Sequence, residues 1–278
     1  MHAYPYKMSG HIVVTGEDAA DFLQSQFSND LRPFSSSQVT YGLWLDVKGK
    51  VVADSWIRCE GEDQFRILSE YSSGQLIADK LDQHIIADDV ELEVLPAAPA
   101  VALIGTDESE AGISFRGRRS LQASCEVVFA SEAERDNFLS TRNLEKVSEK
   151  WVHEQRIKAG KPLVPMEIGP ADLPGEGGME QDGLSFTKGC FLGQEVVARM
   201  HNVGRSQRAL FVMHGSIQPP AVPSVLFNED EKKVGELRSA YQIDGDWIGV
   251  ALLKIRYVEP GAVLFLSGHP VRVLRALR

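Results

Sequence analysis

The residues with most capacity for chemistry lie together between Ser185 and Met200, in the run SFTKGCFLGQEVVARM. Cys190 stands between two turn-forming glycines, just ahead of helix-forming residues that begin at Gln194. Free N–H groups and the dipole at a helix start stabilise a thiolate, and the ammonium of Lys188 would add to that effect. The sequence therefore makes Cys190 and Lys188 candidate catalytic residues. From chemistry alone, an inert structural cysteine is slightly the commoner interpretation.

His201 is a candidate base for a thiol enzyme that acts without a cofactor. It follows Cys190 by eleven residues. Along one helix that separation is roughly 16 Å at about 1.5 Å per residue, too far for direct contact between the two side chains. This distance makes a cofactor-free thiol enzyme the least favoured of the three functions considered for this chain.

The segment from Lys188 to Glu195, KGCFLGQE, resembles the K-G-C-[FY]-x-G-Q-E signature of the YgfZ family, relatives of the glycine-cleavage T-protein. Weaker similarity extends over 16–30 and 234–251. The resemblance implies a protein that binds tetrahydrofolate or a one-carbon derivative of it. It also implies support for the assembly or repair of iron–sulfur enzymes and, through them, for tRNA modification. The expected partners are folate and iron–sulfur enzymes or cluster carriers.

The same resemblance implies folate-binding residues ahead of the cysteine motif. Pro174-Gly175-Glu176 is similar to the family's P-x-E element, so Glu176 is expected to accept hydrogen bonds from the pterin. Because Glu176 lies in a predicted loop, we expect its substitution to weaken binding with little loss of stability. Arg156, in the preceding predicted helix, is a weaker cofactor-binding candidate, since an arginine near a helix end often only complements the dipole.

Asp54 is the third cofactor-binding candidate. T-proteins resemble this chain here but have two adjacent aspartates, where this chain has Ala53 and Asp54. A carboxylate at this place can bind a pterin N–H or orient an amine, so the loss of one weakens the alternative hypothesis, an aminomethyltransferase of the glycine-cleavage type. A solvent-facing strand residue is an equally ordinary interpretation of Asp54.

The composition narrows the class of protein. The 278 residues carry a net charge of −10, which disfavours direct binding to nucleic acid, because such proteins usually present a basic face. Three cysteines and seven histidines show neither disulfide nor zinc spacing, so no metal site is expected. No apolar run approaches the roughly 18 residues of a membrane span, and the start of the chain does not resemble an export signal. We expect a cytoplasmic protein without membrane contact.

Short basic clusters interrupt this acidic background. Any of them could meet an anionic group such as the glutamate tail of a folate. They comprise Arg116, Arg118 and Arg119; Lys158 and Lys161; and Arg272, Arg275 and Arg278.

The order of the predicted elements indicates an α+β body followed by an all-β segment. Alternating apolar runs predict strands at 11–14, 41–46, 51–57, 65–68, 90–95, 101–104 and 126–130. Helical spacing and capping residues predict helices that begin near Asp18, Ser72 or Ser73, Ser131 and Ser148. The segment 161–183 is rich in proline, glycine and acidic residues, which predicts a long loop. From Ala209 onward, short alternating segments predict a small antiparallel barrel.

The resemblance implies how these parts are arranged. The expected fold is a T-protein-like three-lobed α+β architecture, with two α+β lobes, a C-terminal antiparallel β-barrel and tetrahydrofolate near the centre. The folate-binding body would occupy residues 1–204, with internal boundaries near 40–45, 96–100 and 145–150 and a first lobe that need not be continuous. The barrel would occupy residues 205–278.

Overall fold

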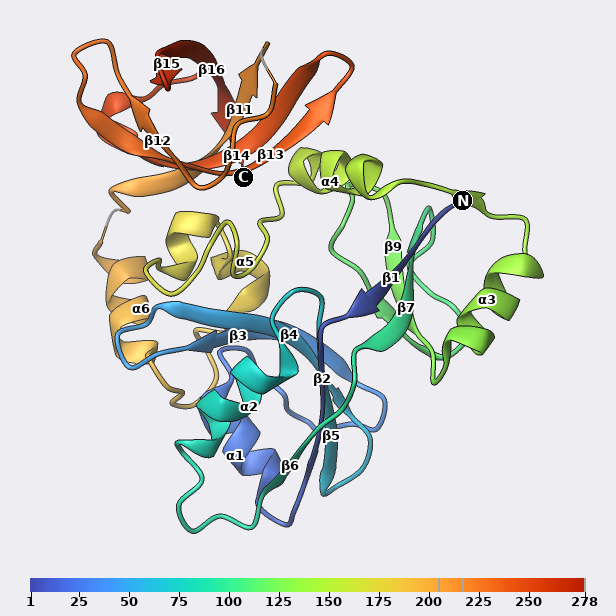
Figure 1. The fold of residues 1–278 in the computed structure, drawn as a ribbon. Helices are drawn as coiled ribbons and strands as arrows, with labels where there is room; N and C mark the ends of the chain where they lie inside the picture. The colour runs from blue at the N-terminus through green and yellow to red at the C-terminus, as the bar shows by residue number, and fades with distance from the viewer. Residues whose placement is uncertain (205, 217, 278) are drawn as a thin grey trace.

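The computed structural model describes residues 1–204, 206–216 and 218–277, which form three lobes around a common centre (Figure 1). Two lobes are α+β and the third is a closed β-barrel, so the predicted fold class is confirmed. One apolar core is shared by all three. It contains Leu43 and Trp56 of the first lobe, Ala100 of the second, and Leu210 and Val250 of the barrel.

The first lobe is a five-stranded antiparallel sheet with two helices on one face (Figure 1). The strand order is β3-β4-β5-β2-β6. Phe22 of α1 and Leu81 of α2 pack with Ile12 and Ile67 of the sheet, so both helices bury their apolar sides on the same face. The elements are β2 (Gly10–Thr15), α1 (Ala19–Gln26), β3 (Val39–Leu45), β4 (Val51–Cys59), β5 (Gln64–Ser69), α2 (Gly74–Asp82) and β6 (Glu91–Val94).

The second lobe is a five-stranded sheet of order β10-β1-β7-β9-β8, covered by one helix. Its strand β1 was not predicted, because Pro5 interrupts the donor pattern of a strand. β1 nevertheless pairs along its whole length with β7, from His2 opposite Ile104 to Met8 opposite Ala98. The elements are β1 (His2–Met8), β7 (Ala98–Ile104), β8 (Ile113–Arg116), β9 (Ser124–Val128), α3 (Glu132–Ser140) and β10 (Glu145–Lys146).

The strand pairing within the two sheets defines where one lobe ends and the next begins. The second lobe, which contains the start of the chain, is discontinuous, since the whole first lobe lies between β1 and β7 in the sequence. The expected boundary near 40–45 has no counterpart, because β3 pairs with β4 within one sheet. The chain passes from one sheet to the other between Val94 and Ala98.

The barrel joins the body through α4 (Glu149–Lys158), the segment 159–193, and α6 (Gln194–Asn202). The 159–193 segment is largely irregular, as predicted, and contains η1 (Pro174–Gly177) and α5 (Glu180–Gly183). The barrel closes in the order β11-β14-β13-β12-β15-β16. Its elements are β11 (Arg208–Gly215), β12 (Ser224–Phe227), β13 (Lys233–Ile243), β14 (Asp246–Lys254), η2 (Ile255–Tyr257), β15 (Val263–Leu266) and β16 (His269–Ala276).

Serine caps are confirmed at three helices. The hydroxyls of Ser73, Ser131 and Ser148 each accept an N–H of the first helical turn, at 3.2 to 3.3 Å. The prediction that Asp18 caps α1 was wrong. The Asp18 backbone is helical rather than extended, and its carboxylate accepts the N–H of Asp89 at 2.7 Å instead.

Arg119, in the loop between β8 and β9, ties the second lobe to the first. Its guanidinium is buried, donates to Glu126 at 2.8 Å, and forms a second ion pair with Glu70 of the first lobe. Tyr6 donates to the other oxygen of Glu126 at 2.6 Å. Burial, together with the nearby charge of Glu126, raises the pKa of Glu70 from 4.5 to about 7 although Arg119 opposes the shift.

We predict that Glu70 makes the stability of the protein depend on pH between about 4.5 and about 7. The folded protein keeps the Glu70 proton to a higher pH than the unfolded chain does, so this contribution is complete below about pH 4.5 and is lost as the pH rises through about 7. Urea unfolding of Glu70→Gln at several pH values should show a flatter profile than the wild type. The exposed Glu62→Gln is the matched control, and parallel profiles for Glu70→Gln and wild type would contradict the prediction.

Candidate functional site

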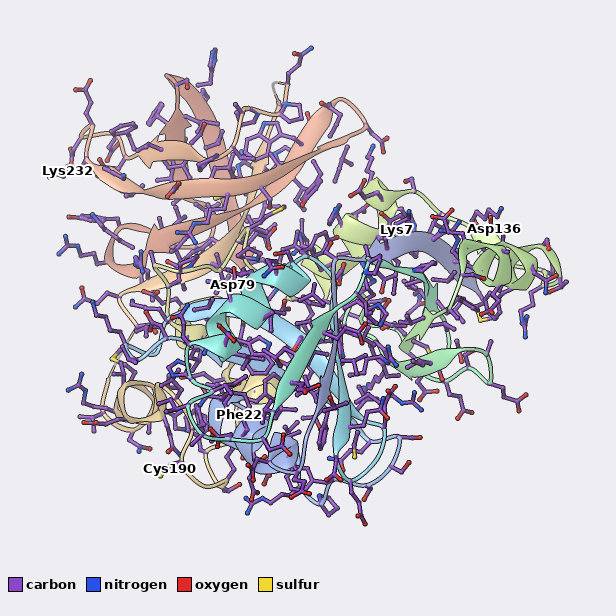
Figure 2. The ribbon with its side chains drawn as sticks, turned by 60° about the horizontal axis from the view of Figure 1, so that its bottom comes forward. Lys7, Phe22, Asp79, Asp136, Cys190 and Lys232 are labelled. Carbon is purple, nitrogen blue, oxygen red and sulfur yellow. The ribbon has the colours of Figure 1, made fainter. Side chains whose placement is uncertain are left out.

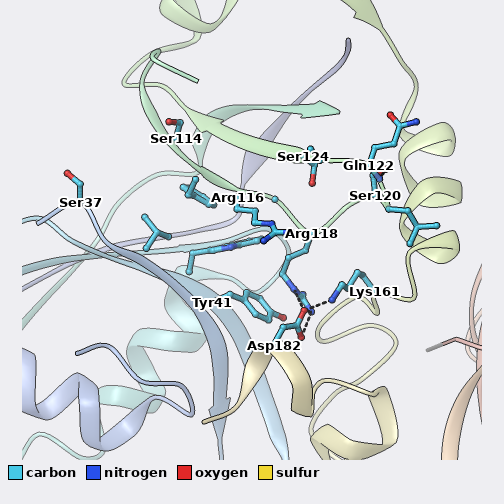
Figure 3. A pocket seen from close by; sticks show the side chains of 16 residues that line it. Ser37, Tyr41, Ser114, Arg116, Arg118, Ser120, Gln122, Ser124, Lys161 and Asp182 are labelled. Atoms are coloured by element: carbon cyan, nitrogen blue, oxygen red, sulfur yellow. Dashed lines mark hydrogen bonds and ion pairs between the residues drawn. The ribbon is translucent and has the colours of Figure 1, made fainter. Parts of the chain in front are cut away.

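A cavity of about 630 Å³ lies between the first and second lobes (Figure 3). Tyr41 of β3, Trp56 of β4 and Phe115 of β8 form its aromatic part, and Trp56 lies 5.2 Å from each of the other two rings. The remaining wall comes from Ser37 and Val39, from β8, the β8–β9 loop and the start of β9, and from Lys161 and Asp182 of α5. Strand alternation directs Tyr41 and Trp56 to the sheet face that the two helices do not cover.

Arg118 crosses this cavity wall and organises its charges. Its guanidinium carbon lies 3.6 Å from the centre of the Tyr41 ring, a cation–π contact. The same side chain donates two hydrogen bonds to Asp182, at 3.1 and 3.2 Å, and Lys161 forms an ion pair with the same carboxylate (Figure 3). Burial raises the pKa of Asp182, but Arg118 and Lys161 outweigh it and hold the pKa below its usual value.

Asp54 lies behind Tyr41. It accepts hydrogen bonds from the Tyr41 hydroxyl at 2.9 Å, from Ser72 at 3.2 Å and from Ser69 at 3.4 Å. The solvent-facing interpretation is therefore wrong, because Asp54 is buried, and burial raises its pKa. Asp54 does not line the cavity itself but orients the tyrosine that does. Ala53 packs in the core beneath the helices, so a carboxylate at that position would point away from the cavity.

Two of the three basic clusters meet at the cavity. Arg116, Arg118 and Lys161 line it, whereas Arg119 binds Glu70 and Lys158 pairs with Glu154. The third cluster helps to attach the barrel to α4. Arg275 of β16 donates to the carbonyls of Ile157 and Lys158 at the end of α4, and Arg278 lies outside the described residues.

Glu176 is buried in an ion pair away from this cavity. Its two oxygens accept hydrogen bonds from Arg208 of β11, both at 2.8 Å, and one also accepts the N–H of Leu173 at 2.9 Å. Arg208 and Arg238 of the barrel both pair with Asp172 as well. The structure thus gives Glu176 a role in attaching the barrel, which argues against the expectation that its substitution causes little loss of stability.

Arg156 is also buried in an ion pair, within the connection between the body and the barrel. It donates to both oxygens of Glu167, each at 2.8 Å, and to the carbonyl of Lys161 at 2.6 Å. Glu167 accepts a further bond from Ser239 of the barrel. Arg156 therefore fixes α4, the 161–183 segment and the barrel together, and it does not line the cavity.

The Lys188 ammonium binds carbonyls at the end of α1 rather than the Cys190 thiol. Its ammonium donates to the carbonyls of Gln24, Phe27 and Asn29 at 2.7, 2.7 and 2.9 Å, which uses all three of its N–H bonds. A cation at this place satisfies carbonyls that a helix end leaves free. The proposed activation of Cys190 by Lys188 is not supported by this geometry, and the lysine instead anchors the motif to the first lobe.

Cys190 is exposed at the edge of the molecule (Figure 2). It precedes α6, which begins at Gln194 as predicted, after Gly193 in the left-handed region at φ 83°. A side chain at position 193 would come within 2.5 Å of the Asp46 carbonyl, so this approach of α6 to the β3–β4 turn requires glycine. His201 stacks on Phe186 at the far end of α6, which agrees with its exclusion as a base for Cys190.

Possible metal ligands and possible membrane-spanning helices do not narrow the function further. Within 1–204, 206–216 and 218–277, no group of three or more His, Cys, Asp and Glu side chains is arranged to hold a metal ion. In the same ranges no helix has the length and apolar character needed to cross a membrane.

Comparison with known proteins first defines the class. A family model described as the GCVT N-terminal domain matches residues 6–111. The crystal structure of the glycine cleavage system aminomethyltransferase T from Bartonella henselae superposes with a TM-score of 0.76 at 17% identity, and covers 98% of this chain and 85% of that one. The fold is therefore that of the T-proteins.

Comparison with curated sequences narrows the class to a family. The tRNA-modifying protein YgfZ of Colwellia psychrerythraea is 25% identical over 267 residues, which cover 84% of this chain and 79% of the relative. YgfZ of Vibrio vulnificus is 24% identical over 280 residues, with 94% and 86% covered. YgfZ of Yersinia pestis is 25% identical over 274 residues, with 87% and 81% covered. Together with the matched domain, these relatives support assignment of the chain to the YgfZ family.

We predict that Glu176→Ala lowers the free energy of unfolding by about 3 kcal/mol, because it leaves Arg208 without its main partner in a mostly buried ion pair. Chemical denaturation measures the change. Glu154→Ala, which removes an exposed i,i+4 pair with Lys158, is the control and should cost at most about 0.5 kcal/mol. Equal effects of the two substitutions would show that the Glu176 pair does not hold the barrel.

We also predict that a thiol reagent labels Cys190 far faster than the other cysteines. Cys59 and Cys125 are buried, and burial raises the pKa of both thiols, that of Cys125 to about 11. Peptide mapping after brief alkylation of the folded protein measures the order. Comparable labelling of Cys125 in the native state would refute the assignment of Cys190 as the accessible thiol.

Proposed function

We propose that this protein binds tetrahydrofolate, or a one-carbon derivative of it, in the cavity between the first two lobes and supports iron–sulfur enzymes that modify tRNA. The observation that carries the proposal is the pairing of aromatic walls with three cationic side chains in one cavity of about 630 Å³. The curated relatives, which are named tRNA-modifying protein YgfZ, also support the proposal. The proposed place of action is the cytoplasm.

The residues of the cavity suit the chemistry of a folate. Small-molecule sites usually measure about 300–1,000 Å³ and combine apolar walls with a few polar groups. Trp56, Tyr41 and Phe115 would face the pterin and benzoyl rings. The hydroxyls of Ser114, Ser120 and Ser124 offer hydrogen bonds. Arg116, Arg118 and Lys161 would face the carboxylates of the glutamate. Tetrahydrofolate would supply a nitrogen that carries a one-carbon unit.

Cys190 has a separate place in the proposal. It is not among the residues that line the cavity, and it is exposed at the start of α6. We therefore assign the thiol to contact with a protein partner, an iron–sulfur enzyme or a cluster carrier, for which an exposed soft ligand is suited. Lys188 contributes by anchoring the segment that carries the thiol.

The alternative is an aminomethyltransferase, the activity named for the structural relative. The likeness at 17% identity concerns the fold. Position 53 faces away from the cavity, so the presence of Ala53 does not decide between the two functions. Methylene transfer from an aminomethyl donor to tetrahydrofolate does decide: binding without turnover supports the accessory role, and binding with turnover supports the transferase.

We predict that Arg116→Glu weakens tetrahydrofolate binding by at least about tenfold, since it replaces an exposed cation at the cavity with an anion that repels the glutamate tail. Isothermal calorimetry of the purified protein measures the affinity. Lys146→Glu, the same charge reversal on the exposed β10 of the same sheet, should leave affinity unchanged. Equal affinity of Arg116→Glu and wild type would remove this cavity as the folate site.

The partner role of Cys190 has its own test in cells. Cys190→Ser keeps the size and hydrogen bonding of the side chain but removes the soft ligand, so tetrahydrofolate affinity should be retained while the activity of iron–sulfur enzymes falls. Cys59→Ser, at a buried cysteine, controls for general loss of a thiol. Normal iron–sulfur enzyme activity with Cys190→Ser would show that the thiol is dispensable.

A further inference from the structure

The cations of the cavity are already engaged by a carboxylate of the chain itself. Asp182 accepts two hydrogen bonds from Arg118 and an ion pair from Lys161. Among the described residues that line the cavity, Asp182 is the only acidic one, against three cationic side chains. Its side chain is 32% exposed, so this carboxylate lies where a ligand entering from solvent would reach it.

The geometry around Asp182 allows its side chain to leave while the backbone stays. The Asp182 carbonyl accepts a hydrogen bond from Asn29 at 3.1 Å, and Ser28 donates to the next carbonyl, that of Gly183, at 2.6 Å. Both bonds fix α5 to the first lobe. Arg118 is equally fixed by its stacking on Tyr41. A rotation of the Asp182 side chain would therefore expose a preformed cationic site rather than dismantle the cavity.

We propose that Arg118 and Lys161 form a carboxylate subsite in which Asp182 acts as an internal competitor for the ligand. In the free protein Asp182 occupies the subsite, and a ligand with a carboxylate tail binds by replacing it. This inference rests on the proposed function for the identity of the ligand, whose glutamyl group is the competing carboxylate. The contact offsets one of the two positive charges in the free state and makes the binding of an anionic tail weaker than the cations alone would give.

A ligand pair that differs only in the tail isolates the subsite. Tetrahydrofolate carries the glutamyl carboxylates, whereas tetrahydropteroate lacks the glutamate. Asp182→Asn removes the competing charge and should bind tetrahydrofolate about tenfold more tightly than wild type, because two cations become available and one repulsion is lost. Its affinity for tetrahydropteroate, whose single carboxyl group sits on the benzoyl ring, should change much less. The ratio of the two affinities, measured by calorimetry, is the readout.

A matched variant separates this effect from a general change of charge. Glu180→Gln removes an equal charge from the same short helix, but Glu180 pairs with His201 and does not line the cavity. Both affinities should equal those of wild type in this variant. If Asp182→Asn leaves the ratio at its wild-type value, or lowers it, Asp182 is not a competitor and the inference is overturned.

A second variant keeps the test usable if Asp182→Asn is poorly folded. Lys161→Gln alters a partly exposed side chain and should weaken tetrahydrofolate binding about tenfold while changing tetrahydropteroate binding much less. An equal loss for both ligands would overturn the subsite.

The failure of the proposed function gives a different result from the failure of this inference. If wild type binds neither pterin ligand, the folate assignment fails, and glutarate then serves as the probe of the subsite alone. Glutarate should raise the thermal unfolding midpoint of Asp182→Asn more than that of wild type or Glu180→Gln. An equal response of all three proteins would overturn the subsite.

Discussion

Two consecutive arginines hold the first two lobes in a fixed relative position. Arg118 and Arg119 leave the same loop between β8 and β9, where Arg119 is buried and Arg118 is largely buried, in different surroundings. Arg119 joins Glu126 of its own lobe to Glu70 of the first lobe, and Arg118 joins Tyr41 of the first lobe to Asp182 of α5. Buried guanidinium groups require partners on several sides, so this loop, both sheets and α5 are held in one relative position. The cavity exists because that position leaves a gap between the sheets.

Local signals in the sequence predicted most of the helices and strands, and three of the helix caps. Ser73, Ser131 and Ser148 could be recognised because a hydroxyl acts within one helical turn. The barrel was also predictable, since alternation and turn residues are local. Strand β1 was not, because its position depends on pairing with β7, far along the chain. Because Pro5 disrupts the local strand pattern, a short window of the sequence does not predict this strand.

The site was only partly predictable for the same reason. The basic clusters at 116–119 and 158–161 could be seen in the sequence, but their convergence on Tyr41 and Asp182 is a tertiary fact. The sequence predicted Glu176 and Arg156 as ligand-binding residues, but it did not predict their ion pairs with Arg208 and Glu167, because no sequence spacing connects the paired segments. The motif around Cys190 combines both cases. Its helix start was predictable, whereas the attachment of Lys188 to the end of α1 was not.

The position of β1 has a consequence for the order in which the chain folds. β1 is made first, but its neighbours β7 and β10 follow only after the entire first lobe. The first lobe has its own sheet, helices and apolar core, and can close while β1 is still unpaired. Its closure brings Met8 and Ala98 near each other, which reduces the entropy that must be lost when β1 and β7 pair. Folding of the inserted lobe thus prepares the completion of the interrupted sheet, and nascent chains that end before β7 would leave β1 without its antiparallel partner.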